Sequence, residues 1–416
     1  MFYGSRVWDR LEHAQGPATD LADLLAQVRA DDWDAATLYA LEQRLVGDAV
    51  HSAAPVVVPL LLDVVEDPAL PDTGLMVWLI GRIAWVARTA RPEAIDPAWP
   101  DAWERALPRL LALTDHDDSY VRAWVPSALA AAVDQADLVW PVLRDRVPVE
   151  PDAEVAAALV LAAGWLGVPQ ARDWFAGLLD ADAVVVRMAA VLGLRHLGVP
   201  IEEAQLPLLV EGFVKSFELD TVWCVSGRRT TGVPGLAREL GDDVPTLRKI
   251  LVSVIGLDDV LLRYHVMMQS VDVLHPSMLP AIAAWLTDPD PPNRFVAGYL
   301  PAAAGTDAAP YADDIATRLT DWPPSAHAAM VALAVLGDER AVEPLVRWLP
   351  EGRTTLVMAE GDFWTPPPLE EVLIGMRAHA DALLPAVRER LDKSADEAES
   401  AAFRRVVEAW QAPQRQ

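Results

Sequence analysis

One short unit of sequence recurs along the chain and constrains its fold more than any other feature. The clearest copy, Asp115-His-Asp-Asp-Ser-Tyr-Val-Arg122, is an acidic turn between two apolar stretches that have helical spacing. Weaker copies end at Arg187, Arg263 and Arg294. The four arginines are separated by 65, 76 and 31 residues, which fits two, two and one units of roughly 31–38 residues. Periods of this length are typical of stacked helical pairs.

Each unit is expected to contain a first helix, an acidic turn and a second helix. Several second helices should end in Leu-Gly, because glycine readily adopts the left-handed conformation that closes a helix. The expected first helices cover residues 55–66, 103–114, 138–146, 170–179, 202–217, 246–255, 278–286, 311–319, 341–349 and 383–391. The expected second helices cover residues 73–88, 119–133, 153–166, 183–197, 259–273, 292–304, 325–336 and 368–380. No segment alternates like a strand, so the sequence predicts an all-α fold.

This succession of a proline-containing first helix, an acidic turn, a Val-Arg second helix and a terminal Leu-Gly resembles HEAT repeats, especially the short bacterial type. The resemblance covers roughly residues 52–390, and the preceding block His13–Asp20 resembles the start of a set of bacterial HEAT-repeat proteins. It implies a right-handed α-α superhelical solenoid of about ten HEAT-like helical pairs, with the second helices on the concave face. HEAT-like proteins include interaction scaffolds, bilin lyases and DNA glycosylases, so the resemblance implies little about function.

The two ends of the chain are expected to differ from the array between them. Residues 1–50 are interpreted as an N-terminal helical cap, with helices near 21–28 and 35–46. Residues 51–416 are interpreted as the repeat array, which ends in a C-terminal capping helix. Caps of this kind are expected because the outermost helices of a solenoid face water on one side.

Two irregular insertions, at 216–235 and 351–368, interrupt the period. Each lies between an expected first and second helix, so both should project from the same edge of the stack. They carry the aromatic and arginine residues that are frequent in binding hot spots. The candidate partner-binding residues are therefore Trp223, Arg228, Arg229, Phe363 and Trp364. The competing interpretation is that each insertion completes an irregular repeat, with its tryptophan in the core.

The repeated arginines and most tryptophans have structural interpretations. Arg122, Arg187, Arg263 and Arg294 are expected to bond to acidic turns of the same or the next repeat, as a ladder. Core or helix-seam positions are expected for Trp78, Trp85, Trp124, Trp165, Trp174, Trp285 and Trp348.

The net charge of −27, from 61 acidic and 34 basic residues, disfavours nucleic acid as the main partner. It either serves solubility or attracts a basic protein partner. The single cysteine, Cys224, excludes an intrachain disulfide and a cysteine-based metal site. No apolar run reaches the ~18 residues of a membrane span, and the first residues lack a signal-peptide pattern. We therefore expect a cytoplasmic protein.

The sequence contains no assignable catalytic or cofactor motif. A phosphate-binding loop, a dinucleotide-binding turn and a Gly-x-Ser-x-Gly elbow are all missing. The eight histidines are scattered and none forms a His-x-x-x-His pair, so no metal site is expected. Cys224 lies close to Arg228 and Arg229 in sequence, but no general base can be assigned to it. No catalytic residue, cofactor or metal is predicted.

These observations favour a non-enzymatic scaffold that binds another protein. One specific version is an immunity or antitoxin-like inhibitor whose acidic concave surface blocks a basic toxin enzyme. The alternative is a HEAT-fold enzyme or small-molecule binder with a groove near Trp223, Arg228 and Arg229. A third hypothesis is nucleic-acid binding by a locally basic strip.

Overall fold

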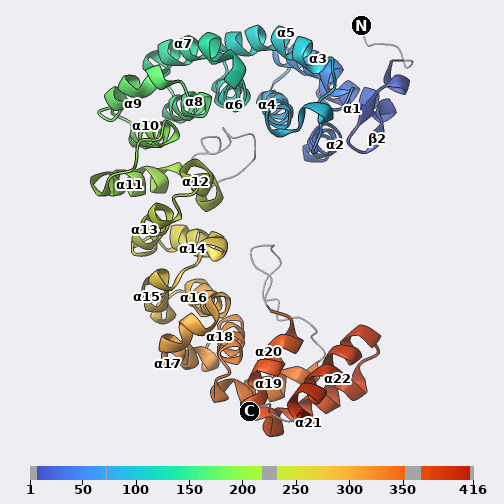
Figure 1. Cartoon of the computed structure of the whole chain (residues 1–416), viewed down its shortest axis with the longest axis vertical. Helices are drawn as coiled ribbons and strands as arrows, with labels where there is room; N and C mark the ends of the chain where they lie inside the picture. The colour runs from blue at the N-terminus through green and yellow to red at the C-terminus, as the bar shows by residue number, and fades with distance from the viewer. Residues whose placement is uncertain (1–6, 72, 218–231, 352–366, 413–416) are drawn as a thin grey trace. The chain divides into compact units, whose positions relative to one another are not determined.

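The structure is a computed structural model that describes residues 7–71, 73–217, 232–351 and 367–412. The chain divides into two compact units, residues 1–243 and 244–416, and each is described by itself. In both units the helices follow one another in pairs (Figure 1). The all-α fold built from successive helical pairs, predicted from the sequence, is confirmed.

In the described part of unit 1, a 3-10 turn (Trp8–Arg10) and a short hairpin precede the helices. Strand β1 (Glu12–His13) pairs antiparallel with β2 (Gly16–Pro17), and two residues per strand are too few to produce an alternating pattern in the sequence. The helices are α1 (Leu21–Arg29), α2 (Ala35–Leu45), α3 (Ala54–Val65), α4 (Gly74–Thr89), α5 (Trp99–Ala112), α6 (Ser119–Leu129), α7 (Ala136–Arg146), α8 (Ala153–Leu166), α9 (Arg172–Leu178), α10 (Val184–His196), α11 (Leu206–Ser216) and α12 (Gly232–Leu240).

The helices of unit 1 form two rows. The second helices α4, α6, α8, α10 and α12 pack against one another in chain order, and the first helices lie along the other side (Figure 1). Helices α6 and α8 are enclosed, because every residue from 121 to 130 and from 155 to 164 is buried. Residues 155–164 of α8 are apolar on all sides of the helix, and five of them are alanines.

Glycines allow the second helices of unit 1 to approach closely. A Cβ on Gly81 of α4 would lie 2.7 Å from Ser127 Oγ of α6. A Cβ on Gly164 of α8 would lie 3.0 Å from the Cα of Gly193 of α10. Neither gap accommodates a larger residue without movement of the backbone or of a neighbour.

Unit 2 repeats the same scheme. Its helices are α13 (Val244–Ile255), α14 (Val260–Gln269), α15 (Leu279–Ala283), α16 (Pro291–Ala304), α17 (Ala312–Ala316), α18 (Pro323–Val335), α19 (Val342–Trp348), α20 (Leu369–Gly375), α21 (Ala380–Lys393) and α22 (Glu397–Gln411). Helices α14, α16, α18, α20 and α22 pack in chain order as the second row. The short first helices α15 and α17 continue as 3-10 turns, Ala284–Thr287 and Thr317–Thr320.

The acidic turns end as helix caps. The side chains of Asp118, Asp152 and Asp259 each accept a hydrogen bond of 2.9 Å from a backbone N–H in the first turn of α6, α8 and α14 respectively. A carboxylate is favoured there because these N–H groups have no partner within the helix. The closing glycines Gly167 and Gly337 have φ of +67° and +70°. The acidic and Leu-Gly signals in the sequence thus mark the start and the end of second helices.

The tryptophans expected in the core or in helix seams lie at contacts between neighbouring helices. Trp78 and Trp124 are buried, with ring centroids 6.3 Å apart across α4 and α6. Trp174 of α9 meets Trp140 of α7 edge to face at 4.9 Å. Trp348 is buried on α19. Wide gaps between helices are filled in this way.

Residues 232–235, which the sequence interpretation placed in the first insertion, form the first turn of α12. Val233 and Leu236 are buried, and the helix packs on α10 and α11. Among the described residues, no helix combines the length and apolar character that a membrane crossing requires.

Candidate functional site

The five candidate partner-binding residues predicted from the sequence are Trp223, Arg228, Arg229, Phe363 and Trp364. All of them lie outside the residues that the structure describes. Their role therefore stays a prediction, and the site is built here from the described residues.

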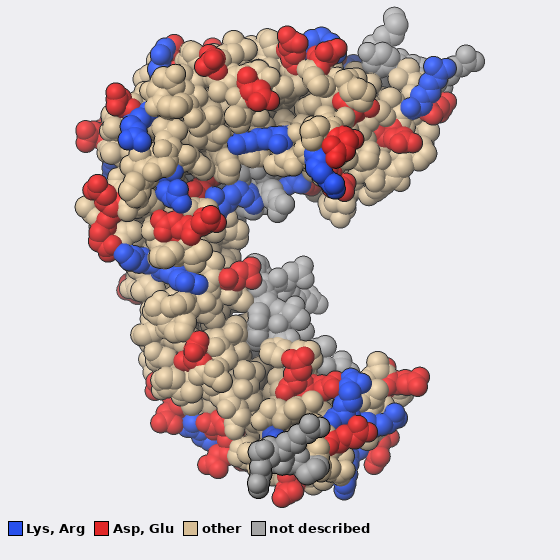
Figure 2. Space-filling view, viewed as in Figure 1, with Lys and Arg blue, Asp and Glu red and all other residues tan. Residues whose placement is uncertain are grey.

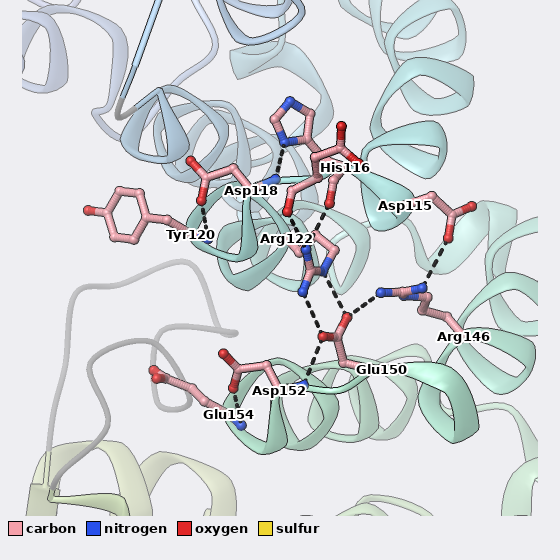
Figure 3. Close-up of polar contacts among 10 residues, drawn as sticks. Asp115, His116, Asp118, Tyr120, Arg122, Arg146, Glu150, Asp152 and Glu154 are labelled. Carbon is pink, nitrogen blue, oxygen red and sulfur yellow. Dashed lines mark hydrogen bonds and ion pairs between the residues drawn. The ribbon is translucent and has the colours of Figure 1, made fainter. Parts of the chain in front are cut away.

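The best-defined polar feature of unit 1 is the arginine that opens α6 (Figure 3). Nη1 of Arg122 donates to the carbonyl oxygens of His116 and Asp117, at 2.8 and 3.0 Å. Its Nε and Nη2 donate to the two carboxylate oxygens of Glu150 in the next repeat, both at 2.9 Å. One guanidinium thus ties its own acidic turn to the following turn.

Glu150 is the centre of this network, and its side chain is 0% exposed. It also accepts a hydrogen bond of 2.6 Å from Arg146 and one of 3.0 Å from the backbone N–H of Asp152. Burial by itself raises the pKa of Glu150, but the hydrogen bonds from Arg122, Asp152 and Arg146 outweigh it and bring the pKa below its usual range. The carboxylate is therefore held charged inside the protein.

Arg294 repeats this arrangement, and Arg263 repeats its carboxylate contacts. Arg294 donates to the carbonyl oxygens of Asp288 and Pro289 and, through two further bonds, to the carboxylate of Asp321. Arg263 pairs with Asp258 at 2.9 Å and with Asp288 at 3.6 Å. The predicted arginine ladder is confirmed at these positions.

Arg187 binds its turn through the backbone. Its Nη1 donates to the carbonyl oxygens of Ala181 and Asp182, at 2.7 and 2.9 Å. These carbonyls occupy the same positions relative to the arginine as the two that Arg122 binds. Arg187 therefore fixes its turn in the same way.

An open cavity of about 510 Å³ in unit 1 lies beside the turn that Arg122 holds, and we name it the turn cavity. It lies between the turn that joins α3 to α4 and the turn that joins α5 to α6. Four carboxylates line it: Asp67, Asp115, Asp117 and Asp118. Apolar lining comes from Val65, Pro68, Leu70 and Pro71. The cavity combines negative charge with an apolar wall.

Two of the four carboxylates interact with arginines, since Asp118 lies within electrostatic reach of Arg122 and Asp115 pairs with Arg146 at 3.3 Å. Among the described residues, the carboxylates of Asp67, Asp117 and Asp118 have no ion-pair partner, although Asp67 accepts a backbone N–H and Asp118 caps α6. Such a site attracts cations, and its apolar wall suits the aliphatic stem of a lysine or arginine side chain.

In the row of second helices of unit 1, negative charge is concentrated in the turns and not on the helices. Helices α4, α6, α8, α10 and α12 carry two glutamates, Glu154 and Glu239. The same helices carry six arginines: Arg82, Arg88, Arg122, Arg187, Arg195 and Arg238. On the face drawn in Figure 2, Asp and Glu side chains are interspersed with Lys and Arg in both units. The turn cavity is therefore a better candidate for an acidic binding site than the faces of the second helices.

A second cluster lies at the C-terminal ends of the second helices. Trp85 Nε1 donates to Ser127 O at 2.9 Å, and Arg88 Nη1 donates to Ala130 O at 2.8 Å, so both bind carbonyls at the end of α6. The guanidinium of Arg88 lies 4.5 Å from the ring of Trp85 and 5.5 Å from that of Trp165. Burial lowers the pKa of Arg88. This part of the cluster is a cap for α6.

The same cluster contains a buried carboxylate. Glu239 of α12, whose side chain is 1% exposed, accepts a hydrogen bond of 3.0 Å from Trp165 Nε1. His196 Nε2 lies 2.8 Å from its other oxygen. These contacts join α8, α10 and α12, and they satisfy a carboxylate that would otherwise be costly to bury.

Sequence reasoning treated Asp115–Arg122 as scaffold alone. The structure confirms that role for Arg122 and adds a second one, because the exposed aspartates of the same turn line the turn cavity. The available signal was a second acidic, proline-containing turn, Glu66-Asp-Pro68, one repeat earlier. The cluster around Trp165 and Glu239 had no local signal, since 74 residues separate the two.

The helical packing and the arginine ladder place the chain among all-α helical-repeat proteins. No family model matches it, and neither does any curated protein. Two similar solved structures are a crystal structure of an engineered protein and the structure of human deoxyhypusine hydroxylase in complex with glycerol. The first is 15% identical over 94% of this chain and 94% of that chain, with a TM-score of 0.31. The second is 16% identical over 68% of this chain and 97% of that chain, with a TM-score of 0.30.

The fold assignment rests on the packing of the chain's own helices. Within the described ranges, no group of three or more His, Cys, Asp or Glu side chains could hold a metal ion.

Proposed function

We propose that this protein is a non-enzymatic scaffold that binds a basic protein partner at the turn cavity of unit 1. The observation that supports the proposal is the cavity of about 510 Å³ with three carboxylates that form no ion pair among the described residues. Lysine and arginine side chains fit such a site, because an apolar stem can pack on Pro68 and Pro71 while the charged head meets the aspartates.

The ladder supports this function by holding the cavity in shape. Arg122 fixes the carbonyls of His116 and Asp117 and is itself fixed by Glu150. The turn is therefore ordered before a partner arrives, which reduces the entropy lost on binding. The net charge of −27 adds a long-range attraction that raises the association rate of a basic partner.

An inhibitor of a basic enzyme is the finer form of this proposal. It requires that the partner be an enzyme and that the bound scaffold cover the active site of that enzyme. A small cationic ligand is the second candidate, because the cavity volume falls within the range of ligand pockets. Such pockets are mostly apolar, whereas this one carries four aspartates, so a protein side chain is the better fit.

The test compares two matched pairs of substitutions. Asp67→Asn with Asp117→Asn removes two charges from the cavity and keeps hydrogen-bond acceptors of the same shape. Asp180→Asn with Asp182→Asn removes two charges from the turn between α9 and α10, which does not line the cavity. Immobilised protein of each kind is incubated with lysate of the native host, and bound proteins are identified by mass spectrometry. The same proteins are titrated with spermine by calorimetry.

We expect the wild type and the Asp180/Asp182 variant to retain the same basic protein. The Asp67/Asp117 variant should retain at least about tenfold less, and raising the salt should release the partner from all forms, since exposed charges are screened over about 10 Å at 0.1 M. Equal retention by all three forms would overturn the proposal. Tight spermine binding that only the cavity variant loses would instead establish the small-ligand candidate. Activity assays of a captured enzyme, with and without the scaffold, then decide the inhibitor form.

A further inference from the structure

The corresponding turns of unit 2 present apolar side chains to solvent. Leu261 of α14 is 66% exposed and Leu257, in the turn before it, is 37% exposed. Trp322, the residue that precedes α18, is 47% exposed. We name the surface formed by Leu257, Leu261, Pro292 and Trp322 the unit 2 rim. A half-exposed tryptophan leaves a large apolar surface in water, and tryptophan is enriched among the residues that dominate binding interfaces.

Trp322 is held in place by the ladder. Its backbone N–H donates to Asp321 Oδ1 at 2.7 Å, and that carboxylate accepts two bonds from Arg294 and one from Arg318. The residues that follow are Pro323 and Pro324, whose fixed φ stiffens the start of α18. The indole is thus carried by an ordered backbone, as preorganised binding residues are.

The residues of the unit 2 rim lie on successive turns in register. Leu261 and Pro292 are the second residues of α14 and α16, which pack together, and α16 packs on α18. The ladder contacts Arg263–Asp288 and Arg294–Asp321 connect these turns one after another. With helix separations of roughly 8–10 Å, Leu261 and Trp322 are roughly 16–20 Å apart.

Carboxylates accompany the apolar residues. Asp258 and Asp259 lie between Leu257 and Leu261 and are exposed, and Asp290 precedes the prolines of α16. Asp258 pairs with the ladder arginine Arg263, whereas Asp259 and Asp290 form no ion pair among the described residues, so the outer side of the rim is apolar and acidic. A complementary ligand has apolar anchors with cationic residues between them.

We propose that the unit 2 rim binds a basic amphipathic segment of a partner protein, with Leu261 and Trp322 as the two apolar contact points. A separation of roughly 16–20 Å corresponds to roughly 11–13 residues of α-helix at 1.5 Å per residue. The segment therefore carries apolar residues about eleven positions apart on one helical face, with Lys or Arg between them. This inference extends the proposed scaffold function to a second surface and does not depend on the turn cavity.

The probe is a fluorescein-labelled helical peptide of 14 residues, with leucines at positions 2 and 13 and lysines along the same face between them. One control peptide has glutamate in place of each lysine, and another has the second leucine moved to position 6. Binding to the full-length protein is measured by fluorescence anisotropy. The variants are Trp322→Ser, Leu261→Ser and Asp290→Asn. The matched control is Tyr39→Ser, which alters a tyrosine of α2 that is 62% exposed.

We expect Trp322→Ser and Leu261→Ser each to weaken probe binding at least about fivefold, and Asp290→Asn to weaken it at low salt. Tyr39→Ser should bind the probe like the wild type. The loss caused by Trp322→Ser should persist when the substitution is made in the Asp67→Asn/Asp117→Asn background, so failure here is distinguishable from failure of the turn cavity. Circular dichroism of each variant confirms that it is folded. Unchanged probe affinity in folded Trp322→Ser, or equal binding of the glutamate peptide, overturns the inference.

Discussion

The guanidinium of Arg294 donates hydrogen bonds of 2.6 and 2.9 Å to the two carboxylate oxygens of Asp321, and so joins two successive turns of unit 2. Arg122 and Glu150 are joined in the same two-bond geometry in unit 1. The separations along the chain are 27 and 28 residues, close to one repeat. The ladder therefore joins neighbouring repeats, and its loss should lower the free energy of unfolding.

Replacing Glu150 by alanine should destabilise unit 1 strongly. The change leaves Arg122 and Arg146 without the buried carboxylate that both bind, and a broken buried ion pair typically costs about 3–5 kcal/mol. Urea unfolding followed by tryptophan fluorescence measures the effect. Asp145→Asn is the control, because this aspartate is exposed and pairs with a neighbouring exposed arginine, so little change is expected.

A double substitution separates the cost of an unpaired buried charge from the net contribution of the ion pair. If the cost of Glu150→Ala comes from an unpaired charge, Arg122→Met combined with Glu150→Met should be more stable than Glu150→Met alone. A double variant that is less stable than the single one would contradict this account. It would show that the contacts of Arg122 with the carbonyls of His116 and Asp117 contribute more than the pair.

The Arg294–Asp321 pair should make the stability of unit 2 depend on pH in the acidic range. Hydrogen bonds from Arg294 lower the pKa of Asp321 from 3.8 to about 2. Between these values the unfolded chain binds a proton that the folded chain does not, so this stabilisation is complete above pH 3.8 and is lost as the pH falls through 2. The difference in unfolding free energy between wild type and Asp321→Asn should therefore narrow from pH 5 to pH 2. A constant difference across this range would refute the linkage.

The sequence predicted repeated features because each one leaves a local mark. Acidic caps, closing glycines and helical spacing gave the bounds 153–166 for a second helix, and the structure has α8 at Ala153–Leu166. The ladder arginines were recognisable for the same reason, since Arg122 and Arg294 each follow an acidic turn by a few residues.

Features that depend on contacts distant in sequence could not be predicted. The Ala-rich sequence favoured a helix over 119–133, but α6 ends at Leu129. Its last carbonyls bind Trp85 and Arg88, which lie 42 residues away in each case, and no local pattern indicates such a cap. The turn cavity likewise needs two turns from different repeats, and its aspartates taken singly look like ordinary helix caps.

Close packing around Gly193 should make this residue intolerant of a side chain. A Cβ there would lie 2.4 to 2.8 Å from three ring atoms of Phe175, which is fully buried. Overpacking of this kind typically costs about 1–3 kcal/mol, so Gly193→Ala should lower the urea midpoint. Phe175→Leu should partly restore stability in the double variant. Gly177→Ala is the control, because no atom lies within 4 Å of its Cβ position, and it should be neutral or slightly stabilising. Similar losses from both glycine substitutions would mean that helix geometry, not contact with Phe175, decides the effect.

The end of α6 should loosen when Arg88 is removed. Arg88→Ala deletes the hydrogen bond to Ala130 O and the stacking on Trp85 and Trp165. A helix carbonyl that loses its partner opens more easily, so we expect faster amide hydrogen exchange in residues 127–133 and a loss of about 1–2 kcal/mol in unfolding free energy. Arg88→Lys tests the geometry, because lysine keeps the charge but lacks the planar fork that can bond a carbonyl while stacking on indole rings. The lysine variant should exchange at an intermediate rate. Wild-type exchange in Arg88→Ala would show that the burial of residues 121–130, and not this cap, holds the end of the helix.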